Sequence, residues 1–178
     1  MSLLTAAGVL AYAACATGFD LRERRIPNWL SATGFLAALA TAPMSGGVGV
    51  PAALLGAGLG LGALYIPFSL GAVGGGDVKF AAVAGAWLGP RVGLNALLLG
   101  SAAGLFVALG AAALTGRAGA ALAAAGRMVW LFAANPSFGT LPPAPAADAQ
   151  VAPIPYAVPL AAGVAGAVVL AGKGWLLV

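Results

Sequence analysis

Long apolar runs, separated by short polar or glycine- and proline-rich breaks, follow one another along most of the 178-residue chain. No charged side chain occurs in residues 1–19, and none occurs in the 51 residues from 26 to 76. Because a membrane-spanning helix needs about 20 apolar residues, the second run is long enough for two helices, and the break from Pro43 to Pro51 divides it. The pattern predicts three helices before residue 77, the first two joined by a surface loop over 20–26.

The next apolar stretch is interrupted by Pro90 and Arg91. One continuous helix through this point would bury Arg91 near the centre of the bilayer, at a cost of about 2.5–3.5 kcal/mol. Two helices, over 77–89 and 92–116, avoid that cost. The first of them would rise only about 20 Å, which is short for a hydrocarbon core of about 30 Å.

The remaining sequence predicts one helix at the membrane surface and one further span. Residues 118–135 are apolar but hold Arg127 in their middle, which favours a helix that lies at the interface, with Trp130 as an anchor. This helix would belong to a cytosolic loop over about 117–152, and the last span would cover 156–172.

Composition supports a membrane protein, because 62% of the residues are hydrophobic and only 7% are charged, against roughly 25% in soluble domains. We predict an all-α fold: a polytopic membrane helix bundle of about six transmembrane helices plus one interfacial helix, in a single domain over 1–178. Basic residues usually mark cytosolic loops, so six spans put both termini outside the cytosol. The basic residues then inside are Arg22, Arg24, Arg25, Lys79, Arg117 and Arg127, and those outside are Arg91 and Lys173.

Few residue types remain to carry chemistry. The chain has no histidine and one cysteine, which excludes Ser–His and Cys–His nucleophile pairs and Cys/His zinc sites, so we expect no metal and no cofactor. The basic residues are typical of cytosolic loops and not of nucleic-acid binding. Any chemistry must use the four acids, which are Asp20, Glu23, Asp77 and Asp148.

Asp20 and Asp77 are predicted to lie at the cytosolic ends of the first and fourth helices. Ionisable groups at membrane depth are costly, and the default interpretation is a functional site. Two neighbouring carboxylates can share one proton, which provides a base to activate water and an acid to protonate a leaving amine. Glycines 74–76 remove side-chain bulk and allow positive φ, so a substrate backbone could approach closely. Glu23 and Asp148 are interpreted as solvated surface charges.

Other interpretations of the same aspartates stay open. Asp77 could cap a helix N-terminus after the glycine turn, and Asp20 could pair with Arg24 at the interface. The two aspartates could also bind a cation or relay protons in a small ion- or proton-coupled transporter, or belong to a non-catalytic scaffold. A phosphate-binding loop is disfavoured, because the Gly-Lys-Ser/Thr ending is missing.

Three segments resemble the type IV prepilin peptidases, which are membrane aspartyl proteases of the GxGD class. Residues 19–28 are similar to the family's first motif, an aspartate followed by a basic stretch and Ile-Pro-Asn. Residues 74–79, Gly-Gly-Gly-Asp-Val-Lys, are similar to the second motif, and residues 153–156 resemble the motif that opens the last helix. The positions around the two aspartates that match these motifs are Pro27, Asn28, Gly74, Gly75, Gly76 and Lys79.

The resemblance implies an aspartic endopeptidase of the intramembrane type, with Asp20 and Asp77 as its catalytic residues. It implies removal of the leader peptide from a prepilin or pilin-like precursor, at the cytosolic face of the bacterial inner membrane, beside the start of the substrate's hydrophobic helix. The cysteine-containing cytosolic region of bifunctional relatives is not found in this sequence. We therefore expect the short, peptidase-only form that serves Flp-type or tight-adherence pili, in an oligomeric state that the sequence leaves open.

Two further patterns carry less weight. Lys79 is interpreted as a lysine that extends its ammonium group to the membrane surface. GxxxG spacing occurs at Gly56 with Gly60 and at Gly100 with Gly104. With 28 glycines in the chain such matches are expected by chance, so they are assigned no function.

Overall fold

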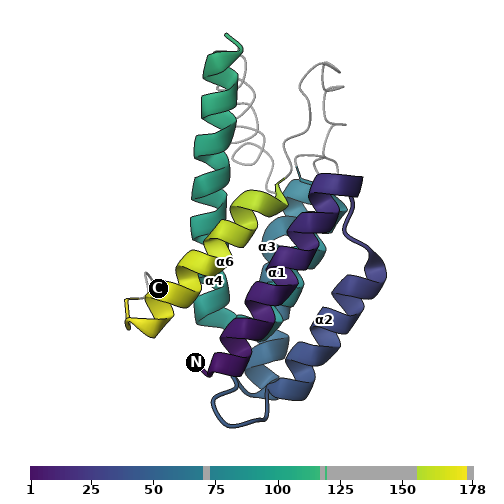
Figure 1. Ribbon diagram of the computed structural model, residues 1–178, viewed down its shortest axis with the longest axis vertical. Helices are drawn as coiled ribbons and strands as arrows, with labels where there is room; N and C mark the ends of the chain where they lie inside the picture. The colour runs from purple at the N-terminus through teal and green to yellow at the C-terminus, as the bar shows by residue number, and fades with distance from the viewer. Residues whose placement is uncertain (70–72, 117–118, 120–155, 176–178) are drawn as a thin grey trace, which may run out of the picture. The chain divides into compact units, whose positions relative to one another are not determined.

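The computed structural model describes residues 1–69, 73–116, 119 and 156–175. Within these residues every regular element is an α-helix (Figure 1), which confirms the predicted all-α class. The predicted interfacial helix over 118–135, within the loop over 117–152, lies outside the described residues. The helices are α1 (Leu3–Glu23), α2 (Asn28–Thr41), α3 (Val50–Ser69), α4 (Gly75–Leu114) and α6 (Ala157–Gly172).

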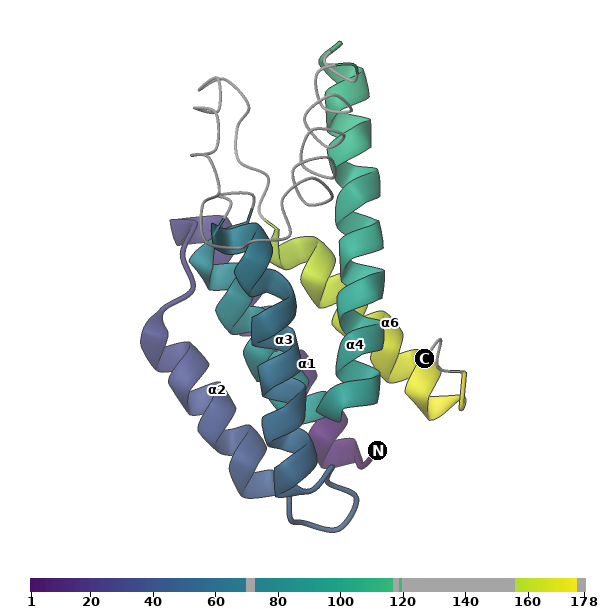
Figure 2. The same ribbon diagram turned by 180° about the vertical axis from the view of Figure 1, so that it is seen from behind.

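The chain divides into two compact units. The first contains Met1–Gly104 and Pro155–Val178, and in it α1 packs against α2 and α6, while α2 packs against α3. Helix α1 lies on the face seen in Figure 1, and α3 lies on the opposite face, seen in Figure 2. The second unit is Leu105–Ile154, whose described part begins with the end of α4. A single domain over 1–178 stays a prediction.

Helix α1 is longer than its uncharged stretch, so the predicted loop over 20–26 is wrong for its first four residues. Leucine, arginine and glutamate are good helix formers. The positive charge of Arg22 in the last turn also interacts favourably with the negative C-terminal end of the helix dipole. The helix ends at Glu23, because Arg24 adopts a left-handed conformation, and Pro27 further disfavours a helical conformation at Ile26. Asp20 therefore projects from the last turn of a helix and not from a loop.

The predicted division of residues 26–76 into two helices is confirmed. Helix α2 ends at Thr41 and α3 begins at Val50, on either side of the connection that the prolines and glycines indicated. Pro27 is the N-cap residue of α2, with φ −62° and ψ 142°, one position earlier than the first-turn place expected for it.

Helix α4 consists of two helical segments joined at Gly89, as the positions of Pro90 and Arg91 predicted. Gly89 has φ 71° and ψ 178°, a backbone conformation open to glycine but strained for other residues. The corner is tight, because a Cβ atom on Gly93 would lie 3.2 Å from the Cα atom of Gly85. The second segment therefore starts against the first.

Trp87 connects the first segment of α4 to two neighbouring helices. Its indole N–H donates a hydrogen bond to the carbonyl oxygen of Gly34 on α2, at 3.1 Å. A Cβ atom on Gly8 of α1 would overlap the same indole ring. Tyr12 of α1 and Phe80 of α4 extend the contact between these two helices, with ring centroids 5.7 Å apart.

Helices α1, α3 and α4 are long and apolar enough to cross a membrane, and α6 is a shorter apolar helix. Large apolar side chains point outward, among them Leu3 at 87%, Phe106 at 75% and Leu114 at 92% exposure. Such surfaces are typical of contact with lipid. These features identify a membrane protein, and the count of about six spans stays a prediction.

Both GxxxG pairs lie at helix contacts, although their spacing alone was uninformative. A Cβ atom on Gly56 of α3 would overlap the carbonyl oxygen of Gly85, and one on Gly60 would overlap that of Ala81. A Cβ atom on Gly100 would lie 3.0 Å from the Cα atom of Leu160 on α6, and one on Gly104 would lie 2.7 Å from the ring of Tyr156, directly before α6. Glycine at these positions lets two helix backbones approach closely.

This packing predicts that Gly56→Ala destabilises the protein by about 1–3 kcal/mol, because the added methyl group must push α3 away from α4. The midpoint of thermal unfolding in detergent should fall. Gly58→Ala is the matched control, since Gly58 lies on the same helix and a Cβ atom there meets nothing within 4 Å. Alanine's better helix propensity should leave that variant unchanged or more stable by up to about 1 kcal/mol. Equal midpoints for the two variants would contradict the prediction.

Candidate active site

Asp77 lies in the first turn of α4 and is 8% exposed. Its Oδ2 atom accepts a hydrogen bond from the backbone N–H of Gly74, at 3.1 Å. Since α4 begins at Gly75, Asp77 is the third helical residue, and its carboxylate reaches back to the residue before the helix as the acid of a capping box does. Asp77 is therefore not the N-cap residue itself, but the capping role left open for it is confirmed, because its carboxylate accepts a hydrogen bond from the N–H of the residue before the helix.

The glycines before Asp77 do not have the positive φ expected for them. Positive φ occurs elsewhere among the described glycines, and Gly75 and Gly76 already belong to the first turn of α4. Of these two, only Gly75 has tight surroundings, while Gly76 has room for a Cβ atom at ordinary van der Waals distance. A Cβ atom on Gly75 would lie 3.3 Å from the ring of Phe68, and one on Gly76 would lie 3.4 Å from Ile26.

Asp20 and Asp77 line one cavity of about 300 Å³, although 57 positions separate them in the sequence. The Oδ2 atom of Asp20 is buried and accepts no hydrogen bond from the described residues. A buried carboxyl oxygen without a donor is costly, so it offers a strong binding site for a water molecule or a substrate N–H group. The other residues that line the cavity are Arg24, Arg25, Ile26, Gly74, Gly75, Gly76 and Lys79.

The two motif segments also meet beside the cavity. The Lys79 ammonium group donates a hydrogen bond to the Asn28 side-chain oxygen, at 2.7 Å. Asn28 is the first residue of α2, directly after the N-cap residue Pro27. Lys79 is exposed, and no pattern in the sequence indicated that Asn28 would be its partner.

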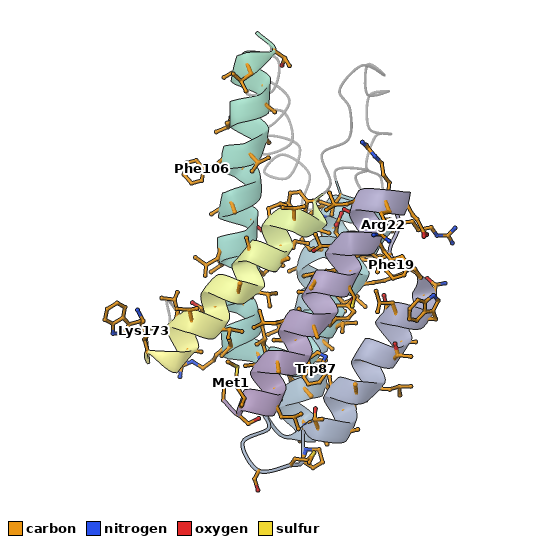
Figure 3. The ribbon with its side chains drawn as sticks, in the orientation of Figure 1. Met1, Phe19, Arg22, Trp87, Phe106 and Lys173 are labelled. Carbon is orange, nitrogen blue, oxygen red and sulfur yellow. The ribbon has the colours of Figure 1, made fainter. Side chains whose placement is uncertain are left out.

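Basic residues gather at the end of α1 that carries Asp20. Figure 3 shows Arg22 at this end, while Met1 and Lys173 lie toward the opposite end of the same unit. Arg22, Arg24 and Arg25 are all exposed.

The remaining acids stay outside this cavity or outside the described residues. Glu23 is exposed and does not line the cavity, and Asp148 is not described. No group of three or more histidine, cysteine or acidic residues that could hold a metal ion occurs in the part of the chain that the structure describes. Of the last motif only Tyr156 is described, and it lies directly before α6 and against Gly104.

Comparison with known proteins gives one match. The family model described as the type IV leader peptidase family matches residues 6–109, which is more than half of the chain and includes both aspartates. No curated protein and no solved structure matches the chain.

The connection after Asp20 contains one strained residue, which generates a prediction. Arg24 has φ 51° and ψ 33°, the left-handed conformation, and its N–H caps α1 by bonding the carbonyl oxygen of Asp20. Arg24→Gly and Arg24→Ala both remove the side chain, but only glycine adopts this conformation without a Cβ penalty of roughly 1 kcal/mol. The glycine variant should have the higher midpoint of thermal unfolding. An alanine variant that melts at the same temperature or higher would show that this conformation is not strained.

Proposed function

The chain belongs to the type IV leader peptidase family, and from this premise we propose that it is an aspartic endopeptidase of pilin-like precursors. Family membership implies a leader peptidase of the membrane. The proposal goes further and assigns the catalytic roles to Asp20 and Asp77, the reaction to the cytosolic face of the bacterial inner membrane, and the substrate to a prepilin.

The shared cavity of Asp20 and Asp77 is the observation that carries the proposal. These two side chains come from opposite ends of a long stretch of sequence, and α2 and α3 lie between them in the chain. Both are at helix ends, Asp20 in the last turn of α1 and Asp77 in the first turn of α4. Glu23, the remaining acid in the described residues, is exposed outside the cavity.

The chemistry requires one ionised and one protonated carboxyl group. The carboxylate takes a proton from a water molecule, whose oxygen attacks the carbonyl carbon of the scissile amide, while the protonated group donates to the carbonyl oxygen. The C–N bond of the resulting diol then breaks, the proton taken from water goes to the leaving amine, and one diol hydroxyl returns a proton to the aspartate that had donated one, which restores the pair. The products are the leader with a new carboxyl terminus and the mature protein with a new amino terminus. No step requires histidine, cysteine or a metal ion.

Glycines at the cavity support access by an extended peptide. Gly74 is exposed, and Gly75 and Gly76 are half-buried, so this part of the wall presents backbone in place of side chains. A substrate main chain can approach such a wall more closely than one built of larger residues.

Charge supports the cytosolic location of the reaction. Arg24, Arg25 and Lys79 line the cavity, and Arg22 lies at the same end of α1. Because basic residues are concentrated on the cytosolic side of membrane proteins, this end of the bundle is the one that faces the cytosol. A pilin-like precursor would reach it before crossing the membrane.

Asp20→Asn and Asp77→Asn should each reduce cleavage by about 10²–10⁴-fold, because asparagine can neither accept nor donate the transferred proton. The full-length protein is co-expressed with a Flp-type prepilin, and loss of the leader is followed by gel shift and mass spectrometry. Glu23→Gln is the matched control, since it removes an acid from the same turn of α1 outside the cavity and should cleave normally.

Cleavage by Asp77→Asn at the wild-type rate would refute the catalytic assignment. The transporter hypothesis would then be tested by measuring pH-dependent ion flux into vesicles that contain the wild type and each variant.

The orientation predicts that both chain termini lie outside the cytosol. Alkaline phosphatase is active only after export, so a fusion behind the last residue should be active. A green fluorescent protein fusion at the same place should be dark, because that protein does not mature after unfolded export. The reverse pattern would place the C-terminus in the cytosol and would contradict the orientation.

A further inference from the structure

Beside the two carboxylates, the segments that carry them meet at a second place. The Lys79 ammonium group bonds the Asn28 side-chain oxygen at 2.7 Å, across 51 positions of sequence. Next to this bond, Ile26 is 1% exposed, and a Cβ atom on Gly76 would lie 3.4 Å from its side chain. The connection between α1 and α2 is thus held on the first turn of α4 by one apolar and one polar contact.

The polar contact is well placed to set the distance between the aspartates. Only the short connection that begins at Arg24 and ends at Pro27 separates the α1 helix, which carries Asp20, from Asn28. On the other side, Asp77 and Lys79 are two residues apart in one helical turn. Fixing Asn28 against Lys79 therefore fixes the two backbones that carry the carboxylates.

The geometry of α4 distinguishes positioning by the Asn28–Lys79 bond from a direct effect of the Lys79 charge on Asp77. Residues two positions apart on a helix do not face each other, so Lys79 and Asp77 leave α4 in different directions. The ammonium group bonds a neutral amide oxygen on another helix.

We propose that Asn28 and Lys79 are positioning residues of the leader peptidase site, and that their hydrogen bond holds Asp20 and Asp77 in place at the cavity that both line. This Asn28–Lys79 clamp rests on the proposed function, because it needs both aspartates to be catalytic. It acts on the reaction only through them. The clamp therefore affects the rate of the chemical step and leaves the binding of the precursor unchanged.

The test measures cleavage of a purified pilin-like precursor by the full-length protein in detergent. Asn28→Ala and Lys79→Met should each lower kcat about tenfold with little change in KM, because a misplaced catalytic group slows the chemical step. The double variant should be no slower than either single variant, since both remove the same bond. Asn28→Asp keeps an acceptor and should retain activity. Lys173→Met, which removes an exposed lysine far from the cavity, is the matched control and should behave as wild type.

The pH dependence of kcat distinguishes the clamp from a direct effect of the lysine charge. If the ammonium group acts on the carboxylates, Lys79→Met will shift the pH profile, and it will do so equally in the Asn28→Ala background. The clamp predicts that Asn28→Ala, which leaves the lysine charge in place, changes the profile in the same way as Lys79→Met, and that Lys79→Met has no further effect in the Asn28→Ala background. A shift that only Lys79→Met produces, or additive losses, overturns the clamp.

A covalent replacement of the hydrogen bond gives a second test. In a Cys15→Ser background, Asn28→Cys with Lys79→Cys should have low activity and should regain it when a short bifunctional methanethiosulfonate joins the two thiols. Failure of the cross-link to form, or a cross-linked protein that stays slow, overturns the clamp.

Measuring Asp77→Asn in the same assay distinguishes failure of the clamp from failure of the proposed function. If the clamp variants cleave like wild type while Asp77→Asn is inactive, the clamp alone is wrong. If Asp77→Asn cleaves normally, or the wild type does not cleave, the proposed function is wrong and the clamp is wrong with it.

Discussion

The first helical segment of α4, from Gly75 to Gly89, is the element on which the rest of the first unit depends. Nearly every residue from Phe80 to Gly89 is buried. Helices α1, α2 and α3 each approach this region at a glycine, which has no side chain to keep the helices apart. These glycines are Gly8 on α1, Gly34 on α2 and Gly60 on α3. Lipid tails are as apolar as these helix surfaces, so close packing, and not hydrophobic burial, must hold such helices together in a membrane.

Part of this fold could be predicted from the sequence because charge and proline limit where a helix can run in a membrane. The division of α4 at Gly89 followed from the cost of burying Arg91, and the separation of α2 from α3 followed from the prolines between them. The end of α1 could not be predicted in the same way. Hydropathy shows where the apolar stretch stops, but the backbone continued through Asp20 until the left-handed Arg24 ended the helix.

In the site, elimination left the four acids as candidates, and their predicted positions together with the resemblance to the two motifs selected Asp20 and Asp77 among them. The contacts around them could not be identified, because they depend on three-dimensional positions that no local pattern contains. The bond between Asn28 and Lys79 joins residues of two motifs that looked independent in the sequence. That Gly75 and Gly76 belong to the first turn of α4 and lack positive φ was likewise invisible without the helix start.

The contact between α1 and α4 explains how these two helices place distant aspartates at nearly the same distance from it. Gly8 of α1 and Trp87 of α4 touch near one end of the unit. From this contact Asp20 lies twelve residues further along α1, about 18 Å, and Asp77 lies ten residues back along α4, about 15 Å. The two helices therefore extend nearly the same distance in the same direction from a common contact, and their carboxylates reach one cavity. A change at the glycine contacts of α4 would move Asp77 along with its helix, so packing far from the cavity controls the geometry of the acid pair.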